Sequence, residues 1–418
     1  MRNPRAYRLY LIARFVLALP AWVVVAVYLV RVAKLDPLEL VLMGTVMEAA
    51  VFAFEVPTGV VADLVSRRLS FAVGWLLQGG GWALAGATKN FELILLAWVI
   101  WGIGATFESG AFEAWITDEV GRENVGRVFL RGTQAAYFGG VVGLVASVGL
   151  ATWNIRAAIF AAGGVTVGMG IAALLVFPET GFRPAPREGR SHGAAMLETT
   201  KSGVRLVGRA PALLLLVTTA LFAGAASEGY DRLWEAHFLR DIGVPDLGGL
   251  DPLWWFAVLG IGTMVLGLFA VNAVARRLEG AAATRMATIL VVLSAVQVAA
   301  MLGFAFASAF ALAVAAVWIV GLARSLIRPV YSTWLNQAID DSSVRATVNS
   351  IASQADAIGE VAGGPGVGAI GKALAIPAAL VTSSLLLTPA VFLYARAVRN
   401  QGREPEFDEL PQTVQAGA

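Results

Sequence analysis

Twelve long apolar runs occupy most of this chain. Each has about 20 residues or more, the length that an α-helix needs to cross the hydrocarbon core of a bilayer. Strands of a membrane barrel would instead alternate over about 10 residues. The runs therefore predict an all-α integral membrane protein with twelve transmembrane helices, at roughly 9–30, 38–61, 69–88, 91–116, 128–151, 155–177, 211–238, 251–275, 284–306, 309–337, 345–371 and 376–397.

The composition agrees with a membrane protein and argues against several other classes. The chain is 58% hydrophobic and only 14% charged, with a mean hydropathy of +0.72, whereas soluble domains are nearer a quarter charged. It has no cysteine and only two histidines, His192 and His237, which excludes disulfides, cysteine nucleophiles and thiolate or histidine-rich metal sites. A nucleotide-binding Gly-x-x-x-x-Gly-Lys-Ser/Thr loop and a Ser-His-Asp constellation are both missing from the sequence. We therefore expect neither an ATP-driven pump nor an enzyme, and no cofactor or metal.

Lysine and arginine residues set the expected orientation. With the N-terminus inside, most of the 31 basic residues fall in cytoplasmic segments, and the outer loops hold only Arg31, Lys34, Lys89, Arg156, Arg240 and Lys372. Both termini are therefore expected in the cytoplasm, in a multi-pass protein of the cell (inner or plasma) membrane. The pI near 9.0 reflects this orientation and not nucleic-acid binding. The first apolar run is too long for a cleaved signal peptide and offers no convincing cleavage site, so we interpret it as a span.

A basic turn occurs twice, half a chain length apart. The first copy runs from Gly59 to Arg68; the second has Asn272 in place of Asp63, and Arg276-Arg277 in place of Arg67-Arg68. Internal repeats of this kind mark secondary transporters. The repeat predicts two pseudo-symmetric halves of six helices each. Because only the first copy carries an aspartate, it also predicts that the principal cytoplasmic gate lies there.

The predicted organisation has four parts. Residues 1–177 and 211–397 form the two six-helix halves, 178–210 form a cytoplasmic linker, and 398–418 form a disordered cytoplasmic tail. In the linker, Lys201, Arg205 and Arg209 recur every four residues opposite an apolar side. This pattern predicts an amphipathic helix on the inner leaflet, with a flexible solvated linker as the alternative.

Twelve spans, a long central loop and a half-length repeat together resemble the major facilitator superfamily. The loop after the second span is similar to its gating signature Gly-x-x-x-Asp-x-x-x-Arg-Arg, matched by Gly59, Asp63, Arg67 and Arg68. The segments 55–59 and 109–115 resemble bacterial drug-efflux-type (drug/proton antiporter) members. The chain departs from such antiporters in two places: segment 98–102 has tryptophans where they often carry an arginine and a glutamine, and segment 139–143 lacks their proline. A Gly-Pro element occurs instead in the eleventh span, at 364–366.

The resemblance implies a gate at the cytoplasmic ends of the spans. In the family the aspartate lies near the start of the eleventh span, where the helix dipole is positive and where this chain has Arg345. We expect Asp63 to latch the two halves when the cytoplasmic side is closed, and Gly59 to allow close approach of helices. Glu113 and Asp118 are expected to join this gate. A plain positive-inside turn would explain Arg67 and Arg68 but not Asp63.

Charged residues inside predicted spans are costly to insert and therefore invite functional hypotheses. By the resemblance, spans one, four, seven and ten line a central cavity, so Arg14, Glu108, Glu228, Asp231 and Arg324 would face it. A carboxylate in a low-dielectric cavity can pick up and release a proton. Structural ion pairs are the alternative for each residue, and two oppositely charged pairs in spans ten and eleven are spaced to meet across neighbouring helices. The preferred proton-coupling candidates are Glu108 first and Asp231 second, and the others are Glu228, Glu48 and Asp356.

The preferred function is secondary active transport by alternating access, with proton-coupled efflux of amphipathic small molecules of the multidrug type. Arg14, Arg324, Arg328 and Trp101 are the candidates for contact with substrate in the cavity. The same arginines keep open a proton-coupled importer of an organic anion or another solute, and a lipid transporter is a further alternative. The expected partners are a small-molecule substrate, protons and membrane lipids, around a monomer.

Overall fold

The computed structural model describes residues 2–20, 22–183, 205, 207–208, 210–246, 248–278, 282–339 and 345–401. Its regular elements are all helical, as the apolar runs predict. In the first part of the chain they are α1 (Pro4–Val16), α2 (Trp22–Tyr28), η1 (Leu29–Ala33), α3 (Pro37–Leu64), α4 (Arg67–Ala87), α5 (Phe91–Glu108), α6 (Ala111–Val120) and α7 (Val125–Val176). In the second part they are α9 (Pro211–His237), η2 (Phe238–Ile242), α10 (Trp254–Leu278), α11 (Ala283–Ala305), α12 (Phe310–Gln337), α13 (Arg345–Ala373) and α14 (Ile376–Gln401).

The structure interrupts two of the predicted spans and joins two others into one helix. The first run is broken between α1 and α2, where Pro20 lacks the N–H that a helix interior needs. The fourth is broken between α5 and α6 at Gly110, whose φ of +70° favours glycine. The fifth and sixth join in α7, interrupted only by the extended backbone of Asn154, whose side chain accepts from the Ala157 N–H and so starts the helix again.

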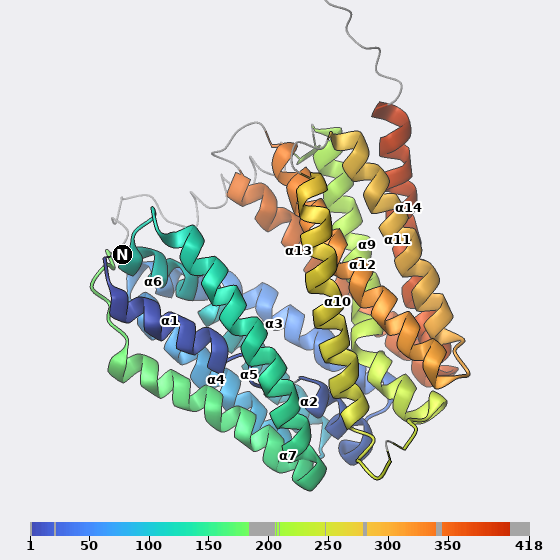
Figure 1. The fold of residues 1–418 in the computed structure, drawn as a ribbon, viewed down its shortest axis with the longest axis horizontal. Helices are drawn as coiled ribbons and strands as arrows, with labels where there is room; N and C mark the ends of the chain where they lie inside the picture. The colour runs from blue at the N-terminus through green and yellow to red at the C-terminus, as the bar shows by residue number, and fades with distance from the viewer. Residues whose placement is uncertain are drawn as a thin grey trace, which may run out of the picture.

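Helices from the two parts of the sequence gather into two groups that lie side by side (Figure 1). In the first group α4 packs on α5 and α7; in the second α9 packs on α13 and α14, and α11 on α12 and α14. The groups meet through α3 against α13 and α9, and through α7 against α10. The N-terminus and the end of α14 lie at the same end of the molecule (Figure 1). Most of the linker and the tail beyond Gln401 lie outside the described residues, so the amphipathic helix stays a prediction.

Glycine lets helices of the first group pack backbone to backbone. A Cβ at Gly74 of α4 would lie 2.6 Å from the carbonyl oxygen of Gly104 in α5, and a Cβ at Gly104 would lie 2.7 Å from that of Gly74. This reciprocal contact is the small-residue packing expected between membrane helices. It fixes α5, and with it Glu108, against α4.

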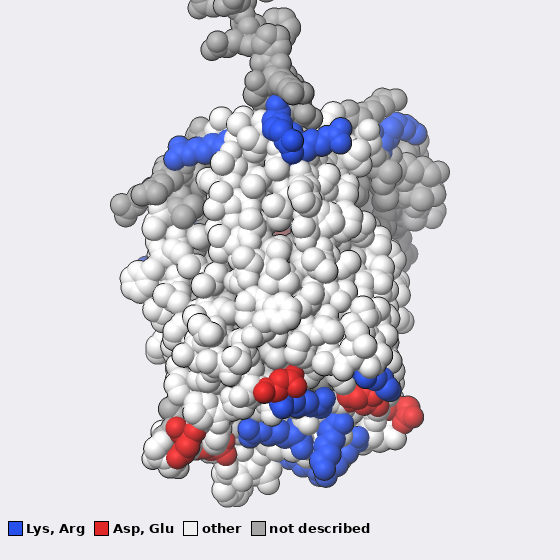
Figure 2. Space-filling model, turned by 90° about the vertical axis from the view of Figure 1, so that its right-hand side faces the viewer, with Lys and Arg blue, Asp and Glu red and all other residues white. Residues whose placement is uncertain are grey.

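The surface agrees with a membrane environment. Eight helical segments of the described chain are long and apolar enough to cross a bilayer. On the face drawn in Figure 2, charged side chains gather at the two ends, and the band between them is almost free of charge. Such a band is the expected surface for contact with lipid chains.

Candidate functional site

A buried ion pair lies where the two groups of helices meet. Glu228 of α9 is only 3% exposed, and Arg232, one turn later, donates from Nε to its Oε1 at 3.0 Å. The pair occupies a notch that exists because two glycines have no side chain. A Cβ at Gly44 of α3 would overlap both side chains of the pair, and a Cβ at Gly364 of α13 would lie 3.1 Å from Glu228 Cγ. Glycine at position 44 of α3 is therefore required by the ion pair of α9 that packs against it.

A second ion pair joins α9 to α12. Arg324 of α12 donates from Nη1 to Oδ1 of Asp231. Its guanidinium also lies over the Tyr230 ring, 5.0 Å from the ring centroid, a geometry in which the face of the ring attracts a cation. The acidic partner of Arg324 is thus on α9. The alternative pairing with the acidic residues of α13, which the sequence spacing allowed, is not the one that Arg324 forms.

An acidic pocket of about 230 Å³ lies between α3 and α13. It holds four carboxylates and no Lys or Arg among the described residues of its lining, which are Glu48, Val51, Phe52, Glu55, Ser353, Gln354, Asp356, Ala357 and Glu360. Glu360 accepts from the Ser227 hydroxyl at 3.3 Å. Within the described chain, the other three carboxylates have neither a hydrogen bond nor an ion pair. We call this cavity the acidic pocket.

The two groups are bridged at the end of the molecule away from the termini. Lys372 Nζ of α13 lies 2.7 Å from Oδ2 of Asp36, the N-cap of α3. Arg240 of η2 donates to the carbonyl oxygen of Leu35 at 2.5 Å. Both contacts cross from the second group to the first, so this end is closed.

The Asp36 carboxyl is held in its ionised form. Partial burial would raise its pKa, but hydrogen bonds from Lys372 and from the Glu39 backbone N–H, with the Lys372 charge, outweigh burial. The pKa of Asp36 therefore lies below its ordinary value. A capping box with Glu39, whose carboxylate accepts from the Asp36 N–H at 2.8 Å, fixes the position of Asp36.

The end next to the termini lacks such bridges in the described part of the chain. Residues 52–57 of α3 are all exposed, and the Asp63 side chain is 65% exposed. Arg345 at the start of α13 is exposed and forms no ion pair with Asp63. A Cβ at Gly59 would meet nothing within 4 Å, so the predicted close approach at Gly59 is not made in this state. Among the described residues, the two groups are therefore joined at one end, and no such contact joins them at the end next to the termini; we call these the closed and the open end.

Comparisons with known proteins identify the family. The model of the Major Facilitator Superfamily matches residues 9–364 of this chain. The chain belongs to the major facilitator superfamily. An uncharacterized MFS-type transporter of Bacillus subtilis (strain 168), YxaM, is 25% identical over 383 residues, which is 90% of this chain and 90% of that protein. The protein is therefore a multi-pass integral membrane protein and a secondary transporter, not an enzyme.

Solved structures of transporters share this fold over nearly the whole chain. The nucleoside transporter NupG has a TM-score of 0.75 at 12% identity, covering 94% of this chain and 98% of its own. A peptide transporter, POT, in complex with sulfate has a TM-score of 0.74 at 14% identity, covering 96% and 95%. A bacterial homolog of the human lysosomal transporter Spinster, in an inward-facing and unoccupied conformation, has a TM-score of 0.72 at 15% identity, covering 96% and 98%. These likenesses confirm the predicted twelve-helix major facilitator fold.

Several predicted site residues of this facilitator come together, and others do not. Four of them, on α3, α9 and α13, lie where the two groups meet: Glu48, Glu228, Asp231 and Asp356. Arg324 of α12 joins them through its pair with Asp231. Glu108 lies apart from them: it accepts from Gln78 Nε2 of α4 at 2.7 Å, inside the first group. Arg14 of α1 is 4.0 Å from Glu113, also within that group.

Trp101 belongs to a cluster of four tryptophans in the first group. Its ring centroid is 4.8 Å from that of Trp22, which also packs on Trp82 at 4.7 Å and on Trp98 at 6.0 Å. Trp22 and Trp98, but not Trp101, line a small cavity of about 70 Å³ together with Asp231, Arg232 and Glu235 of α9. Trp101 was the predicted cavity residue, but the aromatic side chains that line this cavity are Trp22 and Trp98, which lie beside it.

The signature loop of the facilitator fold makes its contacts within its own half. Arg67 pairs with Asp118 of α6 and donates to the Ala114 carbonyl oxygen at 3.1 Å. The Arg68 backbone N–H donates to Glu179 Oε1 at 2.9 Å, and the Ser66 hydroxyl donates to its other oxygen at 2.6 Å. Glu179 was not predicted from the sequence, although it lies just after the sixth apolar run, at the same predicted membrane face as the loop.

Proposed function

We propose that this protein is a proton-coupled exporter of amphipathic organic cations. The observation that carries the proposal is the acidic pocket, with Glu48, Glu55, Asp356 and Glu360 and no basic lining residue in the described chain. Carboxylates gathered in a medium of low dielectric cannot all stay ionised without a counter-charge. Protons or an organic cation can neutralise them, and each excludes the other.

Competition in this pocket would couple the two fluxes. The walls come from α3 in one half and α13 in the other, so a change in how the halves meet changes access to the carboxylates. Phe52, which is 49% exposed, and Val51 supply apolar surface for the rest of an amphipathic molecule. With the predicted orientation, the open end faces the cytoplasm, where substrate would bind as protons leave.

The energy of one proton is sufficient for useful export. A unit charge moving down about 150 mV releases about 3.5 kcal/mol, which supports a concentration ratio of a few hundred-fold. One or two titrating carboxylates would therefore be enough.

Organic-anion import has weaker support from the charges. Of the three arginines that could bind an anion, Arg324 pairs with Asp231 and Arg14 lies near Glu113. Arg328 alone has no ion pair among the described residues. A cavity with four carboxylates would also repel an anion.

Everted membrane vesicles would test the proposal. Vesicles with the protein are energised by respiration, and the pH of the lumen is followed with a dye. Adding ethidium or tetraphenylphosphonium should collapse the pH gradient, and vesicles without the protein should respond at least tenfold less. Glu48→Gln and Glu360→Gln should lower the response about tenfold, whereas Glu92→Gln, at an exposed position at the start of α5, should not. A gradient that collapses with benzoate but with neither cation would contradict export of cations.

A further inference from the structure

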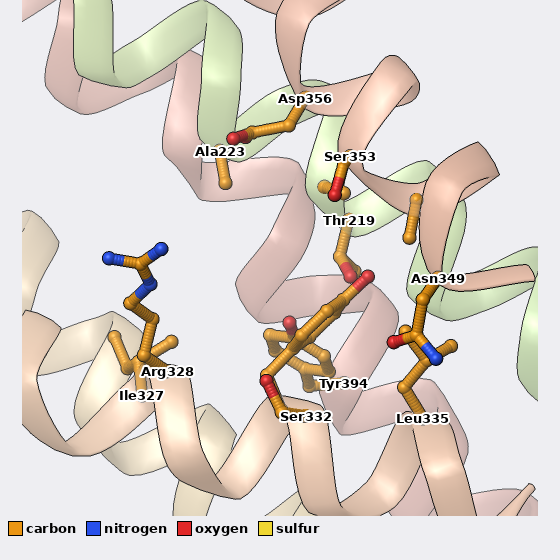
Figure 3. A pocket seen from close by; sticks show the side chains of 13 residues that line it. Thr219, Ala223, Ile327, Arg328, Ser332, Leu335, Asn349, Ser353, Asp356 and Tyr394 are labelled. Carbon is orange, nitrogen blue, oxygen red and sulfur yellow. The ribbon is translucent and has the colours of Figure 1, made fainter. Parts of the chain in front are cut away.

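A second hollow, of about 270 Å³, opens beside the acidic pocket and is lined only by helices of the second half. Its walls come from α9, α12, α13 and α14, and it shares Ser353 and Asp356 with the acidic pocket. Figure 3 shows Arg328 reaching in from α12 and Asp356 from α13, with Tyr394 near the centre and Asn349 at the other end. We call this cavity the C-half pocket.

Arg328 differs from the other two arginines in the interiors of second-half helices. Arg232 is paired with Glu228 and Arg324 with Asp231. Arg328 has neither a hydrogen bond nor an ion pair with any described residue, although Asp356 lines the same pocket. A guanidinium inside a membrane span needs a counter-charge or water. The C-half pocket therefore presents one positive and one negative group that are not joined to each other.

The remaining lining is uncharged and mixes polar, aromatic and aliphatic side chains. The Tyr331 hydroxyl is already engaged, since it donates to the Leu216 carbonyl oxygen at 3.0 Å. Asn349 uses its amide N–H groups on Asn336 Oδ1 at 3.1 Å and on the Arg345 carbonyl oxygen at 2.9 Å, which leaves its own oxygen as an acceptor. Tyr394, 4% exposed, adds an aromatic surface. These groups can hold a small ligand but cannot neutralise Arg328 or Asp356.

We propose that the C-half pocket binds a zwitterionic small molecule, with its anionic group on Arg328 and its cationic group on Asp356. A simple anion would leave Asp356 uncompensated and meet it as a like charge, and a simple cation would do the same at Arg328. Only a ligand that carries both charges can neutralise both Arg328 and Asp356. The pocket would therefore select zwitterions by repelling simple anions at Asp356 and simple cations at Arg328. A carboxylate or phosphate also matches the planar fork of a guanidinium. The inference rests on the proposed function in one respect: Asp356 also lines the acidic pocket, and in both cavities it is taken as a group that receives positive charge.

Equilibrium binding to the purified protein, at pH 7 in detergent and without a gradient, tests the ligand class. Two matched sets serve as probes: phenylalanine, phenethylamine and 3-phenylpropanoate, and γ-aminobutyrate, butylamine and butyrate. In at least one set we expect the zwitterion to bind about tenfold more tightly than its cation and its anion, by isothermal titration. Arg328→Gln should reduce zwitterion binding to the level of the cation, and Asp356→Asn should reduce it to the level of the anion.

Controls separate a local effect from misfolding. Arg328→Lys keeps the charge and should retain most of the preference, while Arg285→Gln, at an exposed position of α11, should retain all of it. Each variant must also keep the wild-type profile in size-exclusion chromatography. The proposal is overturned if neither zwitterion binds more tightly than its own cation and anion, or if the preference survives Arg328→Gln. Because no proton gradient is present, failure of the vesicle assay with a zwitterion preference intact would refute proton-coupled export and leave this site standing.

Discussion

The two halves of this transporter place their charged networks at different depths. In the first half, Arg67 pairs with Asp118 and Arg68 contacts Glu179, at the ends of helices next to the termini. In the second half, the pairs Glu228–Arg232 and Asp231–Arg324 lie within α9 and α12. The two halves thus share a helical architecture, but they differ in where their ion pairs lie along the helices.

From this difference we infer that the ion pairs of the two halves have different roles. Charges at helix ends stay near water, which can replace a lost partner, so their pairs can be exchanged at small cost. Glu228 within α9 is 3% exposed and has little water to replace a lost partner, so its pair with Arg232 fixes the shape of the site. The first half would then contribute exchangeable pairs at the end next to the termini, and the second half a fixed pair within the site.

The largest expected effect comes from breaking the buried pair of the second half. Arg232→Gln leaves Glu228, 3% exposed, without its ion-pair partner, and we expect the free energy of unfolding to fall by about 3 kcal/mol. Arg67→Gln removes the partner of Asp118 at the helix ends, where the two side chains are 20% and 28% exposed. Its cost should be about 1 kcal/mol or less. Both are measured by denaturant unfolding in detergent.

The double substitution Glu228→Gln with Arg232→Gln is the control for this comparison. Two neutral amides can still hydrogen-bond in the notch, so most of the lost stability should return. Equal costs for Arg232→Gln and Arg67→Gln would contradict the difference in depth between the two networks.

The second effect compares two glycines of the same helix. A Cβ at Gly44 would overlap Glu228 and Arg232, whereas one at Gly59 would meet nothing within 4 Å. Gly44→Ala should therefore lower the free energy of unfolding by about 2 kcal/mol, the usual cost of overpacking. Gly59→Ala should leave it unchanged within about 0.5 kcal/mol, although Gly59 is the residue that matches the signature. A loss at Gly59 as large as that at Gly44 would mean that the state open at the end next to the termini is not the stable one.

The third effect compares the two copies of the repeated turn. Asp63→Asn should weaken the state that is closed on the side of the termini by about 1 kcal/mol, or roughly fivefold in population, because the charge can meet the positive start of α13 only there. Asn272→Ala, at an exposed and already neutral position, should change little. The chain has no cysteine, so a single cysteine at Val60 reports the accessibility of this side without background labelling. Equal labelling rates in wild type and Asp63→Asn would exclude the latch.

The sequence predicted the architecture well because a bilayer demands long apolar runs and the runs are continuous. It predicted the site less completely. The spacing of Glu228, Asp231 and Arg232 showed which face of α9 is polar, but spacing along one helix cannot show which helix lies opposite. The spacing pointed Arg324 to the acidic residues of the eleventh span, whereas it pairs with Asp231. Glu108, the first choice for proton coupling, accepts from Gln78 within the first half, and its role stays a prediction. The break at Gly110 was missed because alanine and phenylalanine continue the apolar run on its far side.

The smallest expected effect concerns pH at the closed end. The pKa of Asp36 is lowered in this state, so the stabilisation from its bridge to Lys372 is present above the ordinary aspartate pKa of about 4 and is lost only as the pH falls through the lowered value. Between about pH 7.5 and 5.5 the carboxyl stays ionised, so labelling of a cysteine at Leu38, which packs near Gly368 of α13, should change less than about twofold. Asp36→Asn removes the bridge at any pH and should raise the rate about twofold, a small effect because Lys372 is 55% exposed. A rate that rises steeply in wild type by pH 5.5, but not in Asp36→Asn, would show that the bridge breaks near neutral pH and would refute the lowered pKa.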